Sequence, residues 1–160
     1  MTRAGQFFCA VFAKVTEEDR DYVKQHLNDK GQALFFAMAE FDQAHALRVA
    51  KTIEGFEFYG EREFLVRLAL LHDVGRRAEN VGVLGKVFAV LINGFSVKLG
   101  KYLSRYFRFL YIYYNHPQIG AKLLKDAGFI QESEIIRLHH ENVLNPMEEL
   151  SLLKRADEMN

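Results

Sequence analysis

The 160-residue sequence contains one cysteine, two prolines and no tryptophan. A lone thiol excludes a disulfide within the chain and is typical of a reducing compartment, so we expect a cytoplasmic protein. Because Cys9 lies among apolar residues, we expect it to be a buried and unreactive thiol. The scarcity of proline leaves long stretches without a helix breaker, which favours an all-α fold.

An excess of charge is also missing, because 21 Lys and Arg residues balance 21 Asp and Glu residues. The overall charge therefore gives no indication of a nucleic-acid-binding groove. No uncharged apolar run reaches the roughly 20 residues that a membrane-spanning helix needs. The apolar block near the N-terminus ends at Lys14, too short for a signal peptide, so we expect it to start a core helix.

The remaining pattern is that of a single helical domain. The chain is long enough for one hydrophobic core, and no repeat, linker or low-complexity tract divides it. Thr16 followed by Asp19 predicts a capping box at the start of a helix. No stretch alternates between apolar and polar residues for long enough to predict a strand.

Glycines, prolines and one asparagine predict the helix boundaries. We expect residues 28–31 to end the first of these helices. Gly55 and Gly75 are expected to close the next two helical regions, because glycine is favoured just after a helix. Pro117 and Pro146 are expected at the first position of two later helices, where the missing N–H costs nothing.

Five of the six histidines lie in or next to apolar helical segments, together with two carboxylates. They are His45, His72, His116, His139 and His140, with Asp73 and Asp157. Buried imidazoles and carboxylates need partners, and one metal ion can serve several of them. Such donors favour Fe, Mn, Zn or Ni over Ca. Neighbouring helical residues diverge by about 100°, so His72 and Asp73 could reach around one metal ion, or Asp73 could bridge two.

These residues occur in an order that resembles the HD superfamily of metal-dependent phosphohydrolases. HDVGR is similar to the family's HD-[IV]-G-K turn, and YNHPQIGAKLL to the HP-x-x-G-x-x-L-L segment of its HDIG branch. RLHHEN resembles the double-histidine helix of that branch, and LLKRADEMN its closing Ala-Asp. The resemblance covers residues 36–160.

The resemblance implies a fold and a metal centre. The fold would be a helical bundle with five or more core helices, in which residues 36–160 form the metal-binding core and residues 1–35 a helical extension packed on it. One metal ion would be held by His45, His72, Asp73 and Asp157. Asp73 would bridge to a second ion, completed by His116, His139 and His140.

The resemblance also implies a function. The chain would be a stand-alone hydrolase that binds one or two divalent transition-metal ions and attacks a phosphoester or phosphoanhydride with a metal-bound hydroxide. Its substrate would be a small phosphorylated molecule such as a nucleotide. Two alternatives remain open: a non-catalytic scaffold on the same fold, and a dinuclear-iron oxygenase of the same superfamily.

Two departures from the family pattern bear on the substrate. Arg76 stands where the family has lysine, and arginine holds a phosphate with a planar fork. Arg76 is therefore a candidate catalytic residue beside Asp73, although the pair Arg76–Arg77 could simply be solvated. The segment ENVLNPMEEL lacks the Gly-Tyr-Pro signature of the branch that cleaves cyclic-di-GMP, which argues against that substrate.

Several histidine roles have simpler alternatives. His116 precedes Pro117 and could cap a helix instead of binding metal. On a helix His139 and His140 would diverge by about 100°, which could leave one of them at the surface. Glu141 could orient an imidazole or be solvated. His26 lies in a polar helix and is not included in the candidate site.

A segment without acidic residues, 83–114, separates the two halves of the metal motif. Lys98, Lys101, Arg105 and Arg108 are spaced to form one stripe along a helix, and we expect apolar residues such as Leu99 and Leu103 on its other side. Four interpretations stay open: a core helix with a solvated basic face, an electrostatic funnel for an anionic substrate, peripheral membrane binding to anionic lipid, and a dimer interface.

Overall fold

The computed structural model describes residues 14–78, 91–92 and 94–160, and the described part is helical, without strands. Cys9, the N-terminal apolar block and residues 83–90 lie outside this part. The elements are α2 (Glu17–His26), α3 (Asp29–Phe36), α4 (Glu40–Glu54), α5 (Arg62–Leu71), the 3₁₀ helix η1 (Val74–Ala78), α7 (Val97–Leu103), α8 (Arg108–Ala127), α9 (Ile130–Ile136) and α10 (Glu148–Glu158). The all-α prediction is confirmed.

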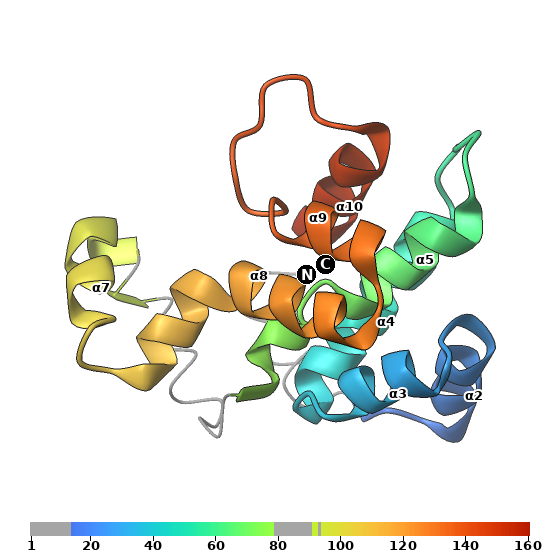
Figure 1. Cartoon of the computed structure of the whole chain (residues 1–160), viewed down its shortest axis with the longest axis horizontal. Helices are drawn as coiled ribbons and strands as arrows, with labels where there is room; N and C mark the ends of the chain where they lie inside the picture. Colours follow the sequence, from blue (N-terminus) through green and yellow to red (C-terminus); the bar gives the residue numbers. More distant parts are fainter. Residues whose placement is uncertain (1–13, 79–90, 93) are drawn as a thin grey trace.

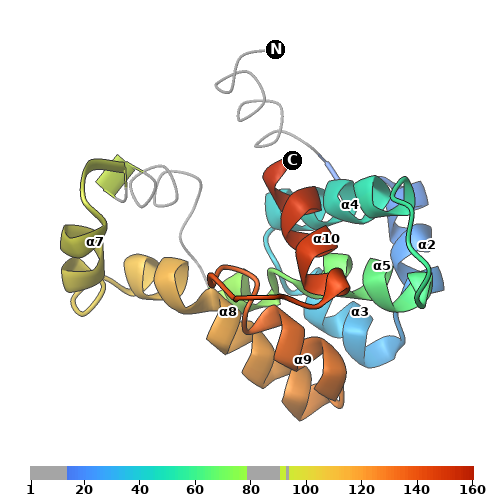
Figure 2. The same ribbon diagram turned by 90° about the horizontal axis from the view of Figure 1, so that it is seen from above.

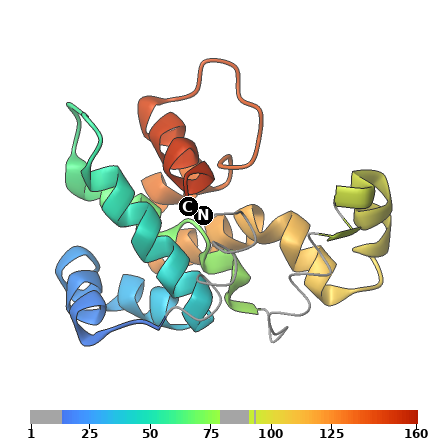
Figure 3. The same cartoon turned by 180° about the vertical axis from the view of Figure 1, so that it is seen from behind.

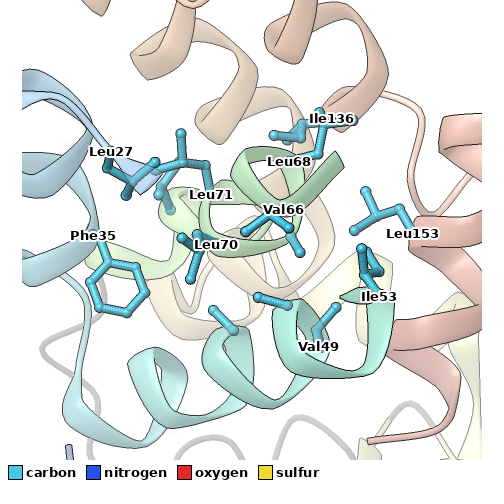
Figure 4. Packing of buried hydrophobic residues seen from close by; sticks show 14 of the residues in the cluster. Leu27, Phe35, Val49, Ile53, Val66, Leu68, Leu70, Leu71, Ile136 and Leu153 are labelled. Atoms are coloured by element: carbon cyan, nitrogen blue, oxygen red, sulfur yellow. The ribbon is translucent and has the colours of Figure 1, made fainter. Parts of the chain in front are cut away.

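Helix α5 packs against α2, α3, α4, α9 and α10, so it lies at the centre of the bundle, behind α4 in the view of Figure 3 (Figures 1 and 3). Its charged residues, Arg62, Glu63 and Arg67, lie in its first two turns, and its last turn is apolar and entirely buried. Figure 4 shows Val66, Leu68 and Leu70 of α5 among core residues of α3, α4 and α10. A helix enclosed in this way holds its C-terminal end, where His72 and Asp73 follow, inside the molecule.

Helices α2 and α3 add to the same core, with Val23 and Phe35 fully buried. The predicted capping box is present, since the Asp19 N–H donates to the Thr16 hydroxyl and the Thr16 N–H donates to the Asp19 carboxylate. The prediction that residues 28–31 end this helix was wrong. Asn28 accepts a hydrogen bond from the Gly31 N–H and thereby caps the start of α3.

Other predicted boundaries also needed correction. Pro117 does not open a helix but lies inside α8, a 20-residue helix that begins at Arg108. Gly75 does not directly follow α5, because that helix ends at Leu71 and Gly75 is part of η1. Pro146 precedes α10 by two residues. Gly55 does follow the end of α4 as predicted, but its φ of −80° is right-handed, so the position does not require glycine.

Two glycines allow η1 to lie directly against α8. A Cβ atom on Gly75 would come within 2.0 Å of the His116 carbonyl oxygen and 2.7 Å of the Gly120 nitrogen. A Cβ on Gly120 would meet the Gly75 nitrogen at 3.2 Å. The backbones therefore approach as closely as only glycine permits. This contact places the His72–Asp73 turn beside His116.

Helix α7 and the first half of α8 project from the bundle as an arm (Figures 1 and 2). Gly100 lies against the hydroxyl end of the Tyr114 side chain, so α7 packs on α8 by a small residue against an aromatic one. The predicted single basic stripe is wrong, because α7 ends at Leu103 and α8 begins only at Arg108. None of the described helices is both long enough and apolar enough to cross a membrane.

Candidate metal centre

Two groups of three metal-capable side chains lie next to each other, with buried members facing the interior of the bundle. One consists of His45, His72 and Asp157, and the other of His116, His139 and His140. In each group, one nitrogen or carboxylate oxygen per residue lies within 4.8 Å of the others. The residues come from five places far apart in the sequence: α4, the end of α5, α8, the turn after α9, and α10.

In the first group, the Nε2 atom of His45 lies 2.9 Å from Oδ1 of Asp157, at hydrogen-bond distance. The Nε2 atom of His72 lies 3.7 Å from the same oxygen, which is too far for a hydrogen bond. His72 is almost fully buried, whereas His45 and Asp157 are half-buried. The three side chains thus converge from α4, α5 and α10 with His72 innermost.

In the second group, the Nε2 atoms of His116 and His140 are 3.1 Å apart. His139 is buried, and its ring lies 5.6 Å from that of His72, centroid to centroid. Helix α9 ends at Ile136, so His139 and His140 lie in a turn and not on a helix. The predicted 100° divergence therefore does not apply, and their ring centroids are 4.1 Å apart. One of the two does lie at the surface, as the sequence allowed, because His139 is buried and His140 is exposed.

Asp73 lies between the two groups. Its Oδ2 atom is 3.6 Å from Nε2 of His72, and its Oδ1 atom is 3.3 Å from Nε2 of His116. One carboxylate thus presents a different oxygen to each group. Arg76 donates to Oδ1 from its Nε at 2.8 Å, which restrains the orientation of the Asp73 side chain.

The three most buried imidazoles share one local hydrogen bond. The Nδ1 atoms of His72, His116 and His139 lie 2.8, 2.9 and 2.6 Å from carbonyl oxygens three residues earlier in the chain. A carbonyl only accepts, so each Nδ1 carries the proton and each Nε2 is the nitrogen directed at the centre. This arrangement fixes the tautomer that a metal-binding histidine needs.

Pro117, which the sequence placed at a helix start, helps to position His116 from inside α8. Inside α8 it lacks the N–H that would donate to the carbonyl four residues earlier, which is that of Tyr113. The Tyr113 carbonyl accepts from Nδ1 of His116 instead. Proline at this position therefore leaves an acceptor for the preceding histidine.

Two buried nitrogens at the centre, Nε2 of His72 and Nε2 of His139, have no hydrogen-bond partner in the part of the chain that the structure describes. Burying an unpartnered polar atom is costly, so natural proteins rarely do so without another partner. Imidazole nitrogens with carboxylate oxygens are the donor set of a transition-metal ion. The residues present fit such an ion.

Burial and neighbouring charges set the protonation of the centre. Burial lowers the pKa of His139 to about 3 and, with the Arg76 charge, holds the pKa of His116 well below its usual range. Burial disfavours the charged form of His72 as well, but the carboxylates of Asp73 and Asp157 outweigh it and raise its pKa to about 9. Without metal, His72 therefore carries an additional proton at neutral pH and is positively charged.

Both carboxylates of the centre are held in their ionised form. Burial opposes this, but the charges of Arg76 and His72 keep the pKa of Asp73 well below its usual range. Hydrogen bonding to His45 likewise lowers the pKa of Asp157 despite its burial. The centre therefore carries two negative charges ready for a cation.

A hollow of about 500 Å³ opens beside the second group. Its walls include His116 and His140 together with Arg76, Lys101, Tyr113, Tyr114, Pro117, Gln118 and Glu141. The sequence analysis missed Tyr113, Tyr114 and Gln118 as functional candidates. A continuous helix through Pro117 would have placed Tyr113 one turn before His116, but the proline was interpreted as a helix start.

The simpler alternatives are resolved differently for each residue. His116 does not cap a helix, because it lies inside α8. No hydrogen bond joins the Glu141 carboxylate to an imidazole among the described residues, which favours the solvated interpretation. His26 lies outside the centre, where its Nδ1 is 2.8 Å from the Glu63 carboxylate.

A protein-family model described as the HD domain matches residues 43–159. Separate comparisons with curated proteins and with solved structures find no match. The match covers most of the chain and contains all seven residues of the centre. The chain therefore belongs to the HD domain family, the superfamily of metal-dependent phosphohydrolases that its motifs resemble.

Proposed function

We propose that this HD domain is a phosphohydrolase that binds two transition-metal ions and acts on a small phosphorylated substrate such as a nucleotide. The observation that supports it most is the placement of Asp73, whose two oxygens lie 3.6 and 3.3 Å from imidazole nitrogens of different groups. A carboxylate between two sets of nitrogen and oxygen donors is what a bridged pair of ions requires.

The seven residues divide into two ligand sets in this proposal. His45, His72 and Asp157 would hold the first ion, and His116, His139 and His140 would hold the second. Asp73 would take part in both sets. Iron, manganese, zinc and nickel all suit these donors.

A pair of divalent ions supplies an activated water near neutral pH and a positive charge for a phosphoryl oxygen. The chain's own residues position the substrate. Arg76 and Lys101 line the hollow beside the second ligand set and provide cations for phosphate oxygens. Tyr113 and Tyr114 form an aromatic wall that suits the face of a nucleobase.

The complete ligand set argues against the scaffold alternative, since a non-catalytic relative would have lost ligands. The oxygenase alternative draws no specific support from this donor set. A reducing, cytoplasmic setting agrees with the single cysteine of the chain.

The decisive experiment is elemental analysis of the purified protein, prepared without chelator or metal-affinity resin, followed by a phosphoester screen. We expect about two transition-metal ions per chain in the wild type, in line with the two ligand sets. Asp73→Ala should lose both ions and all turnover while keeping most of its helix content by circular dichroism. His139→Ala should retain one ion.

His26→Ala is the matched control, because this histidine pairs with Glu63 outside the centre. It should keep both ions and full turnover. Unchanged metal content and turnover in Asp73→Ala would refute the assignment. A wild-type protein that takes up no Mn or Fe would favour the scaffold alternative.

A further inference from the structure

The arm formed by α7 and the start of α8 carries most of the exposed large apolar side chains of the described chain. Eight of the thirteen lie between residues 91 and 111: Leu91, Phe95, Val97, Leu99, Tyr102, Tyr106, Phe107 and Tyr111. Phe95 is 86% exposed and Tyr106 is 70% exposed. Such a concentration on one projecting part marks an interaction surface.

The same arm carries exposed basic side chains and no acidic ones. Lys98, Lys101, Arg105 and Arg108 are exposed, and no ion pair is recorded for them within the described residues. No acidic residue occurs between Glu79 and Asp126 in the sequence. The partner of this surface must therefore supply the negative charge.

Cations and aromatic rings of the arm line one shallow groove of about 710 Å³. Lys101, Arg105 and Arg108 line it together with Tyr106, Tyr111, Ser104 and Asn115. The ring of Tyr102 on α7 lies 5.8 Å from that of Tyr106, so aromatic surface continues from the groove onto α7. Three cations among hydroxyl and amide groups suit a phosphate head group.

We propose that this arm binds the surface of an anionic lipid bilayer, with the exposed aromatic and aliphatic side chains entering the interfacial region and the cations contacting head groups. Basic residues interleaved with aromatic ones are typical of peripheral membrane binding. Tyrosine is enriched where membrane meets water. The arm projects away from the bundle, so a flat surface can reach it without meeting the core helices (Figure 2).

A second copy of the chain fits this surface less well. A symmetric dimer pairs the same patch of both subunits, which would place four cations against four cations. Like charges across an interface oppose association. An anionic bilayer supplies both the opposite charge and an apolar interior.

The test is cosedimentation of the full-length protein with vesicles of phosphatidylcholine alone and of phosphatidylcholine mixed with phosphatidylglycerol. We expect binding to the anionic vesicles only, weakened by salt. Each cation near an anionic surface strengthens binding about fivefold, so the triple variant Lys98→Gln, Arg105→Gln, Arg108→Gln should weaken it on the order of 100-fold. Phe95→Ser with Phe107→Ser should also weaken it.

The matched control is Lys30→Gln, Lys122→Gln, Lys125→Gln, which removes the same charge from exposed positions on α3 and the distal half of α8. It should bind nearly as wild type does. Equal weakening by both triple variants, or no binding of the wild type to anionic vesicles, would overturn the proposal. A dimer in solution that Phe95→Ser with Phe107→Ser dissociates, without vesicle binding, would assign the surface to a second copy instead.

Discussion

At the scale of single residues, the centre depends on where each imidazole carries its proton. Nδ1 of His72, His116 and His139 each lies close to a carbonyl one helical turn back, which leaves Nε2 as the nitrogen directed inwards. This bond forms within four residues of chain, so it needs no help from the rest of the fold. Pro117 serves the same purpose, because it has no N–H and so leaves the Tyr113 carbonyl free to accept from His116.

His72 provides a prediction on pH. Its pKa is raised to about 9 without metal, whereas a metal ligand must be neutral. Metal binding at pH 7.5 should therefore release about one proton from His72, and affinity should rise about tenfold per pH unit up to pH 9. Isothermal titration calorimetry in buffers of different ionisation enthalpy measures this release.

The lowered pKa values of His116, His139 and His140 mean that these residues are already neutral and add no protons. The lowered pKa values of Asp73 and Asp157 mean that both carboxylates are already ionised and release no proton either. Heats of binding that do not depend on the buffer would contradict the protonation of His72.

At the scale of elements, the contact between η1 and α8 joins the two halves of the centre. Asp73 directly precedes η1 and His116 lies in α8, and the two are adjacent only because Gly75 and Gly120 bring the backbones together. The glycine of the HDVGR motif thus acts through packing and not through chemistry at the metal.

Gly75→Ala should separate these elements, because its Cβ would lie 2.0 Å from the His116 carbonyl oxygen. We expect a loss of about 2 kcal/mol or more in the free energy of unfolding, as in overpacked cores, together with weaker metal binding. Denaturant unfolding and metal titration measure the two effects.

Gly94→Ala is the control for this substitution, because a Cβ there would meet no described atom within 4 Å. Its free energy of unfolding should change by no more than about 0.5 kcal/mol. If Gly75→Ala behaved in the same way, the close approach of the two backbones would not matter for stability.

At the scale of the whole molecule, the centre connects helices that otherwise contact one another mainly through the apolar core. Its candidate ligands come from α4, the end of α5, α8, the turn after α9, and α10. Bound metal would therefore link segments from near the start of the described chain to its last helix. The two buried nitrogens that lack a partner among the described residues, Nε2 of His72 and of His139, would then receive one. The cost of burying them is offset only when metal is present.

Removal of metal should therefore lower the melting temperature. Metal at 100 times its dissociation constant stabilises the native state by about 2.7 kcal/mol per site, or at least about 5 °C for a chain of this size. Differential scanning calorimetry with and without a chelator measures the shift. Asp73→Ala should show no shift, and a wild-type protein that melted at the same temperature in both conditions would contradict a structural role for the metal.

The sequence by itself determined the helical class, the family and the identity of the clustered residues. Helical periodicity is local, and His72-Asp73 with the later histidines forms an ordered motif that needs no coordinates. Thr16 and Asp19 likewise predicted their capping box because both partners lie within one turn.

Only the tertiary structure decided which atoms meet. Asp73 lies between two groups because α8 packs on η1, a contact between segments some 40 residues apart that no local pattern encodes. The same holds for Pro117 inside α8 and for the break between α7 and α8, where packing overrides the local preference for a helix start or a continuous helix. Local sequence patterns therefore identified the candidate residues, whereas contacts between distant segments determined which of them lie together.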